Sequence, residues 1–144
     1  MKVILAKHSG FCVGVKHAVD TAMSQPQNTY VLGEIIHNQG VVQAIKDKGL
    51  RVVETLEEIP DNSTVIFRSH GVPESFYEIC EERNIKVIDC TCGVVKRTQK
   101  IVKEQYALGK QIVIIGEPDH PEVIGLTGWC DKTAAVLNSE TQIP

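Results

Sequence analysis

Two cysteines in this sequence stand in closely similar surroundings. Cys12 begins the run CVGVK and Cys92 begins the run CGVVK, so each opens a helical pattern with a lysine four residues on. A thiolate at a helix N-terminus is stabilised by unpaired N–H groups and by the positive end of the helix dipole, which favours metal ligation or nucleophilic attack. Cys12 and Cys92 are therefore the chemical candidates among the five cysteines.

The other cysteines carry weaker signals. Cys90 lies two residues before Cys92 and has no counterpart near Cys12. We expect it to pack at the end of a strand, although alternate residues of a strand share a face and its thiol could approach the same site. Cys80 falls on the apolar face of a helical pattern and is expected in the core, whereas Cys130 fits no pattern.

Three histidines follow apolar runs of the β type. His37 ends GEIIH and His120 ends GEPDH, two runs of the form G-E-x-x-H, while His70 lies beside Arg68 in FRSHGVP. Imidazoles and the N–H groups of a helix N-terminus can together bind phosphate oxygens. We therefore expect His37 and His120 to form an anion site, and His70 is equally open to a site role or a loop role.

Other polar residues near these motifs have two interpretations each. Glu122, two residues after His120, could donate protons or could simply occupy a first helical turn, where carboxylates are favoured. His8 and His17 have no such context and are expected at the surface. A basic run is expected to be a solvated helix face: Lys96, Arg97, Lys100 and Lys103.

Strand-like runs and helical patterns that could position these residues alternate along the chain. The predicted strands cover 2–6, 29–32, 64–67, 85–89, 111–115 and 133–137, and hydrophobic spacing of the helical type covers 15–23, 41–45, 76–80 and 94–106. This alternation predicts an α/β fold of repeated βαβ lobes with small, mostly parallel sheets. Binding sites in such folds gather at the carboxyl ends of strands, where the cysteines and histidines fall.

The order of these features occurs twice. Strand, cysteine, helix, strand, G-E-x-x-H and helix repeat with an offset of 80 residues between Cys12 and Cys92 and 83 between His37 and His120. We expect a first α/β lobe over residues 1–93, with an N-terminal strand and the Cys12 loop, and an incomplete second lobe over 94–144. Zinc and iron–sulfur sites usually take three or four protein ligands, so a third cysteine is expected in a third lobe beyond Pro144.

Composition sets the broad class. A hydrophobic content of 42% and a charged content of 23% are typical of a globular protein, and a net charge of -3 gives no basic field for nucleic acid. The apolar run near the N-terminus is too short for a signal sequence, and no stretch reaches the length of a membrane span. We expect a cytoplasmic protein whose cysteines stay reduced, with neither nucleic acid nor membrane as a partner.

Five motifs in order carry a resemblance to a known family. They are GFCVGVKHAVDTA, LGEIIHN, FRSHGVP, DCTCGVVK and HPEVIGLTGW. Together they closely resemble the 4-hydroxy-3-methylbut-2-enyl diphosphate reductases of non-mevalonate isoprene biosynthesis, and the resemblance covers essentially the whole chain. It implies three α/β lobes in a pseudo-threefold arrangement around a 4Fe-4S cluster. Three cysteines would hold that cluster, and Cys12 and Cys92 would be two of them.

The resemblance also implies an activity and site roles. His37, His70 and His120 would hold the diphosphate of an allylic substrate, and Glu122 would help to deliver protons to the leaving hydroxyl. Two electrons and protons would remove that hydroxyl to give isopentenyl and dimethylallyl diphosphates. The electron donor would be ferredoxin-like or flavodoxin-like.

The sequence departs from the family pattern in two ways. DCTCG stands where the family more often has DATCP, so Cys90 could interfere with the cluster. The family's chains are longer and carry the third cysteine and further diphosphate ligands. This chain alone is therefore expected to be an inactive amino-terminal fragment that holds a cluster poorly or not at all.

Two other functions stay open from the residues alone. One is a zinc-binding or redox-sensing protein without catalysis, using Cys12, Cys90, Cys92 and a histidine. It would leave the two G-E-x-x-H runs without a role. The other is a simple phosphate-binding module, which would leave the matched cysteines unexplained.

Overall fold

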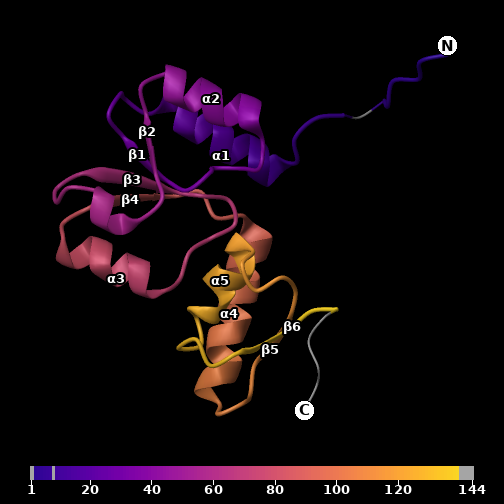
Figure 1. Cartoon of the computed structure of the whole chain (residues 1–144), viewed down its shortest axis with the longest axis vertical. Coiled ribbons are helices and arrows are strands. Elements are labelled where there is room, and N and C mark those ends of the chain that lie inside the picture. The colour runs from indigo at the N-terminus through magenta and orange to yellow at the C-terminus, as the bar shows by residue number, and fades with distance from the viewer. Residues whose placement is uncertain (1, 8, 140–144) are drawn as a thin grey trace.

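The chain folds around two small parallel sheets (Figure 1). The computed structural model describes residues 2–7 and 9–139. The first sheet has the order β2 (Arg51–Val53), β1 (Tyr30–Leu32), β3 (Thr64–Phe67), β4 (Lys86–Asp89), and the second pairs β5 (Val113–Ile115) with β6 (Ala135–Leu137). Every strand pair is parallel. The predicted α/β class with small parallel sheets is confirmed.

Helices cover both faces of the first sheet. The helices are α1 (Val13–Ser24), α2 (Gln39–Asp47), α3 (Ser75–Glu82), α4 (Gly93–Ala107) and α5 (Pro121–Thr127), with a short 3-10 helix, η1 (Leu56–Glu58). Figure 1 shows α1 and α2 on one side of this sheet and α3 on the other. Because strand side chains alternate between faces, Ile66 of β3 packs beneath α1 and α2, whereas Val65 and Phe67 pack in the cluster on the α3 side.

The strand order creates a switch point between β1 and β3. The connection from β1 runs through α2 to β2 on one side, and the connection from β3 runs through α3 to β4 on the other. The loops that leave β1 and β3 therefore diverge at the carboxyl edge of the sheet. In open α/β sheets this divergence forms the crevice in which ligands bind.

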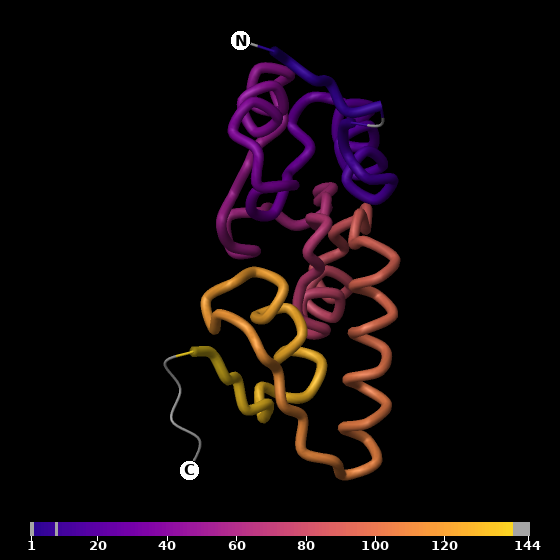
Figure 2. Tube along the Cα trace, turned by 90° about the vertical axis from the view of Figure 1, so that its right-hand side faces the viewer, coloured from indigo at the N-terminus to yellow at the C-terminus, as the bar shows by residue number. Residues whose placement is uncertain are grey.

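The second sheet belongs to a smaller unit with its own core. Buried residues from α4, β5, α5 and the segment after α5 form this core: Val102, Ile114, Val123, Leu126 and Cys130. Figure 2 shows α4 running from the first sheet along the length of this unit. The helix that begins just after Cys92 therefore links the two sheets.

Two glycines at the end of α5 allow the two units to touch through their backbones. A side chain on Gly128 would place its Cβ only 2.4 Å from Pro73 Cβ and 2.7 Å from Pro73 Cα, and Gly125 lies against the backbone of Gly71. The Trp129 indole Nε1 donates a hydrogen bond of 3.0 Å to the carbonyl oxygen of Val72. The segment after His70 is thus held directly against α5.

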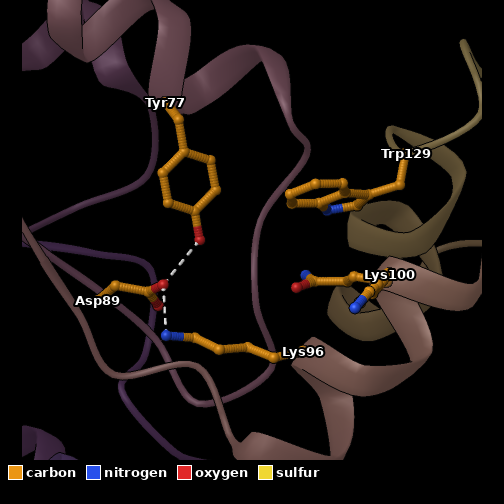
Figure 3. A pocket seen from close by; sticks show the side chains of 6 residues that line it. Tyr77, Asp89, Lys96, Lys100 and Trp129 are labelled. Carbon is orange, nitrogen blue, oxygen red and sulfur yellow. Dashed lines mark hydrogen bonds and ion pairs between the residues drawn. The ribbon is translucent and has the colours of Figure 1, made fainter. Parts of the chain in front are cut away.

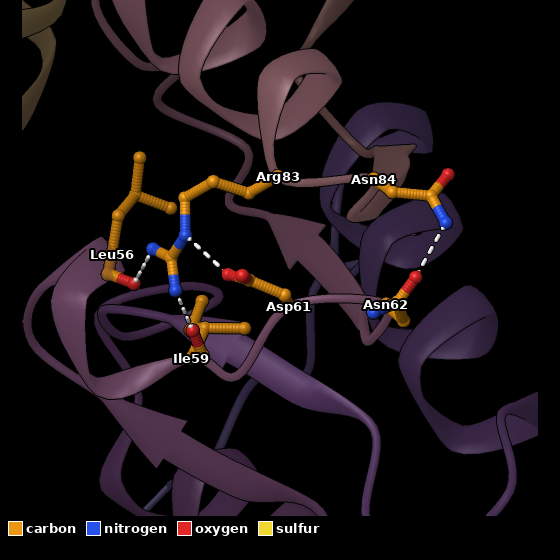
Figure 4. Close-up of polar contacts among 6 residues, drawn as sticks. All are labelled: Leu56, Ile59, Asp61, Asn62, Arg83 and Asn84. Atoms are coloured by element: carbon orange, nitrogen blue, oxygen red, sulfur yellow. Dashed lines mark hydrogen bonds and ion pairs between the residues drawn. The ribbon is translucent and has the colours of Figure 1, made fainter.

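At the amino ends of the strands of the first sheet, Arg83 holds several segments together (Figure 4). Arg83 Nε donates to Asp61 Oδ1 at 2.7 Å, and its terminal nitrogens donate to the carbonyl oxygens of Leu56 and Ile59. These contacts attach η1 and the turn before β3 to the end of α3. They leave the carboxyl edge free for other residues.

Two predicted features of this region are corrected by the structure. Residues 2–6 form no strand, and Ile4 and Leu5 are 79% and 85% exposed, because no strand among the described residues pairs with them. Conversely, β2 was missed because its three residues include the exposed Arg51 and show no clear alternation.

Among residues 2–7 and 9–139, no helix is both long and apolar enough to cross a bilayer.

Candidate functional site

The three predicted histidines lie together. The ring centroids of His37 and His70 are 4.4 Å apart, and the ring of His120 lies 5.8 Å from His37 and 5.9 Å from His70. His37 and His120 are exposed, whereas His70 is half-buried. We call this group the histidine cluster. His70, which the sequence left equally open, belongs to it.

The histidine cluster occupies the switch point of the first sheet. His37 follows β1, and His70 follows β3. Ser69 fixes these two loops to each other, because both its backbone N–H and its Oγ hydroxyl donate to the carbonyl oxygen of Ile35, at 3.3 and 3.1 Å. His120 reaches the same place from the start of α5, whose far end packs against the segment after His70.

A hydrogen bond orients one of the imidazoles, and a carboxylate lies beside another. Nδ1 of His120 accepts from the backbone N–H of Glu122 at 3.2 Å, so in the neutral ring the proton lies on Nε2, which is free to donate. Nδ1 of His37 lies 3.4 Å from Glu34 Oε2, and Gln39 donates to the other oxygen of that carboxylate. Both exposed imidazoles thus have partners on their Nδ1 side.

His70 has the most unusual environment. Burial lowers its pKa from an ordinary 6.5 to about 4, with further lowering by His37, Arg68 and His120 and an opposing effect of Glu34. Its Nδ1 atom is buried and has no hydrogen-bond partner in the described part of the chain. At neutral pH this ring is therefore an uncharged group.

We expect His70 to make stability depend on pH. The unfolded chain binds a proton at His70 below pH 6.5, but the folded chain binds it only near pH 4. The free energy of unfolding should therefore fall as pH is lowered from 6.5 to about 4, with no further loss from this group below that range. Urea unfolding of the parent and of His70→Gln across this range would measure it.

The matched control for this experiment is His17→Gln, because His17 is an exposed histidine on α1. It should keep the slope of the parent, whereas His70→Gln should flatten it. Equal slopes in the parent and in His70→Gln would show that the folded state does not depress the protonation of His70.

The two candidate cysteines occupy equivalent positions. Cys12 is the N-cap of α1 and Cys92 is the N-cap of α4, and neither side chain caps its own helix. A Cβ atom on Gly14, in the first turn of α1, would lie 3.2 Å from Cys92 Sγ. The first turns of α1 and α4 thus meet at the Cys92 thiol. Cys12 is exposed, and Cys92 is partly exposed.

Cys90 is separated from these thiols by its burial. It is 2% exposed and packs with Ala18, Ala22 and Ile66 in the core between α1, α2 and the sheet. Burial raises the pKa of its thiol, although a hydrogen bond with Thr21 opposes this. The expected packing role of Cys90 at the strand end is confirmed, and so is the core position of Cys80.

The turn that carries Cys92 is braced from both sides. The Cys92 backbone N–H donates to the carbonyl oxygen of Ser69 at 2.9 Å, which joins the turn to the loop of His70. Asp89, at the end of β4, accepts from the Thr91 backbone N–H at 2.9 Å and forms an ion pair of 2.8 Å with Lys96 of α4. The first turn of α4 is therefore fixed to the sheet.

Asp89 and Lys96 also line a small cavity (Figure 3). The cavity has a volume of about 260 Å³ and is lined by Tyr77, Asp89, Lys96, Gln99, Lys100 and Trp129. Burial alone would raise the pKa of Asp89, but hydrogen bonds from Lys96 and Thr91 outweigh it and lower the pKa. The predicted solvated lysine face is confirmed, since Lys96 and the other cations of this run are exposed, and Lys96 in addition pairs with Asp89.

Two glycines that shape the site were not singled out from the sequence. A side chain at Gly128 would collide with Pro73, and one at Gly14 would press on the Cys92 thiol. The usual signal of such glycines is a turn, but Gly14 and Gly128 lie in helical conformation or at a helix end. Only the three-dimensional contacts reveal their role.

The described residues contain no group of three histidine, cysteine or acidic side chains that could hold a metal ion. This excludes the histidine cluster as a ready-made metal site within residues 2–7 and 9–139. It also removes the expected ligand set of the zinc alternative, since Cys90 lies in the core. The thiols of Cys12 and Cys92 make no capping hydrogen bond to their own helices.

Comparison with known proteins gives consistent matches over nearly the whole chain. A family model described as LytB protein matches residues 3–143. The 4-hydroxy-3-methylbut-2-enyl diphosphate reductase of Alkaliphilus oremlandii is 45% identical over 99% of this chain and 53% of its own length. That of Caldanaerobacter subterraneus subsp. tengcongensis is 44% identical over 96% of this chain and 51% of its own length.

Solved structures with similar folds agree with these matches. A structure of (E)-4-hydroxy-3-methyl-but-2-enyl diphosphate reductase, the terminal enzyme of the non-mevalonate pathway, matches 96% of this chain and 51% of its own, with a TM-score of 0.75 and 38% identity. The E-1-hydroxy-2-methyl-but-2-enyl-4-diphosphate reductase from Plasmodium falciparum matches 94% and 45%, with a TM-score of 0.84 and 26% identity. The chain thus spans about half the length of these relatives.

Proposed function

This chain belongs to the LytB protein family, and on that premise we propose that it provides part of the active site of an iron–sulfur reductase. The substrate is 4-hydroxy-3-methylbut-2-enyl diphosphate, and loss of its hydroxyl yields isopentenyl and dimethylallyl diphosphates. The observation that carries the proposal is the histidine cluster at the switch point, with the loop of His70 hydrogen-bonded at Ser69 to the backbone of Cys92. An anion site thus adjoins a candidate redox centre.

The histidine cluster would hold the diphosphate of this substrate. Its rings come from three separate segments, so donors can reach phosphate oxygens from several directions. Nε2 of His120 is a donor in the neutral ring because Nδ1 accepts from Glu122 N–H. Glu122 itself follows directly in the first turn of α5, where its carboxyl group would hold and pass on protons to the leaving hydroxyl.

Cys12 and Cys92 would be two of the cysteine ligands of a 4Fe-4S cluster. When bound, such a cluster supplies electrons and a Lewis-acidic iron for removal of the hydroxyl. The chain's own contribution is to present two thiols from adjoining helix N-termini, with Gly14 leaving room at Cys92 Sγ. A further ligand would have to come from outside the described residues. A ferredoxin-like or flavodoxin-like protein would donate the electrons.

Titration with inorganic pyrophosphate tests the anion site separately from the redox chemistry. Calorimetry at neutral pH should detect binding to this chain, and His37→Ala and His120→Ala should each weaken it about tenfold, the size of one charge-assisted hydrogen bond. His17→Ala is the control, because His17 lies on α1 outside the histidine cluster. Unchanged affinity in both cluster variants would overturn the assignment of the diphosphate site.

A further inference from the structure

Arg68 lies next to the histidine cluster without direct use in the function proposed above. It comes just after β3, two residues before His70, and is half-buried. Its Nε atom is buried and has no hydrogen-bond partner in the described part of the chain. A buried guanidinium nitrogen without a partner is costly, so its position calls for a physical reason.

The loop after β1 is shaped to admit this guanidinium. Gly33 has φ +68, and a Cβ atom there would lie 2.5 Å from a terminal nitrogen of Arg68. Any side chain at position 33 would therefore displace the arginine. Gly33 begins the G-E-x-x-H run that ends at His37, so the run combines a seat for Arg68 with one member of the histidine cluster.

The charges around the cluster explain what such a cation does. Glu34 and Glu54 both lie close enough to act on Arg68, and Glu34 also pairs with His37. Burial lowers the pKa of Arg68, and these two carboxylates oppose that effect. An arginine still keeps its proton at neutral pH. Without its charge, these carboxylates would repel a diphosphate, and Glu34 would favour protonation of His70.

We propose that Arg68 is a positioning residue: seated against Gly33, its guanidinium offsets Glu34 and Glu54 and adds to the burial that leaves His70 uncharged, so that the cluster receives a diphosphate beside a fixed positive charge. This inference rests on the proposed diphosphate site. The groups that face His70 are His37, His120, Arg68 and Glu34. Of these four groups, Arg68 is the one that carries a permanent positive charge. Its influence on His70 can be measured without any ligand.

The first test is an NMR pH titration of the His70 imidazole in the parent, Arg68→Met, Arg68→Gln and Arg68→Lys. The pKa of His70, about 4 in the parent, should rise toward its ordinary value in the Met and Gln variants. It should stay short of that value because burial and two imidazoles remain. Arg68→Lys, which keeps the charge, should retain most of the depression.

Arg51→Met is the matched control. Arg51 begins β2 at the amino edge of the same sheet, where it donates to Tyr30 Oη and Asn28 Oδ1, away from the histidine cluster. The titration of His70 should be unchanged in this variant. Circular dichroism shows whether each variant is folded. If Arg68→Met does not fold, Arg68→Gln takes its place as the neutral variant.

The second test is pyrophosphate affinity at neutral pH. It should fall about tenfold in Arg68→Met and Arg68→Gln and should be largely restored in Arg68→Lys. An unchanged His70 titration in both neutral variants would overturn the proposal, as would equal losses of affinity in the lysine and methionine variants. If the histidine variants do not affect pyrophosphate binding, the diphosphate assignment fails, while the His70 titration still decides the role of Arg68.

Discussion

Replacing Cys92 with serine is expected to abolish stable cluster binding. The experiment uses this chain joined to the remaining length of its Alkaliphilus oremlandii relative, reconstituted anaerobically with iron and sulfide. Loss of a residue that merely orients a metal ligand costs about 10- to 100-fold in affinity, so loss of the ligand should exceed that. Iron and acid-labile sulfide should fall to background, and turnover of 4-hydroxy-3-methylbut-2-enyl diphosphate should fall with them.

The neighbouring cysteine provides the control for this prediction. Cys90 is only two residues away, but its thiol is buried in the core. Cys90→Ala should lower thermal stability modestly while keeping iron, sulfide and turnover. Loss of the cluster in Cys90→Ala, with retention in Cys92→Ser, would reverse the assignment of the two thiols.

The same preparation tests the proposed activity as a whole. This chain alone offers no set of three ligands among its described residues, so it should take up little iron. The joined form should carry a cluster and convert the substrate under reducing conditions. A joined form that bound zinc and showed no turnover would instead support a non-catalytic thiol protein.

Gly128→Ala is expected to separate the two units of the fold. Gly128 has φ -68, which alanine adopts without strain, so the expected effect is purely steric. The new Cβ would lie 2.4 and 2.7 Å from Pro73 Cβ and Cα, atoms of a rigid ring and a backbone that cannot move aside cheaply. Overpacking of this kind typically costs about 1–3 kcal/mol of unfolding free energy.

The change should also reach the histidine cluster. His120 begins the helix that ends at Gly128, and His70 precedes Pro73 by three residues, so a displaced α5 moves His120 relative to His70. Pyrophosphate affinity should fall about tenfold or more, in line with loss of one charge-assisted hydrogen bond. Urea unfolding and calorimetry measure the two effects.

Gly93→Ala is the matched control for the glycine substitution. A Cβ atom at Gly93 would meet nothing within 4 Å, and the residue lies at the first position of α4. Alanine should therefore be neutral or slightly stabilising there. Similar losses of stability in both variants would show that the contact at Pro73 has no special importance.

Much of the site could be predicted because a parallel sheet gathers its strand ends at one edge. Hydrophobic runs located β1, β3, β4, β5 and β6, and the residues that follow β1 and β3 then had to lie close together. The repeat separated Cys92 from Cys90, since only Cys92 has a counterpart at a helix start. The structure places one thiol at a helix N-cap and the other in the core.

The errors concern interactions between segments distant in sequence. The apolar run at residues 2–6 has strand-forming residues, but a strand also needs a hydrogen-bonding partner, and no pattern within the run reveals one. Strand β2 was missed for a related reason, because its three residues show no clear alternation and its place in the sheet comes from pairing with β1. Division of the chain at residue 93 into lobes stays a prediction.

The backbone contact between α5 and Gly71–Pro73 has a consequence for the energetics of recognition. His37 and His70 follow strands of the first sheet, whereas His120 belongs to the smaller unit. If these two units were loosely joined, an anion would have to bring them together, and the entropy lost in that ordering would weaken its binding. Here the glycines Gly125 and Gly128 dock the two units when the chain folds. The conformational entropy of assembling the cluster is thus lost during folding, and the imidazoles meet their ligand preorganised.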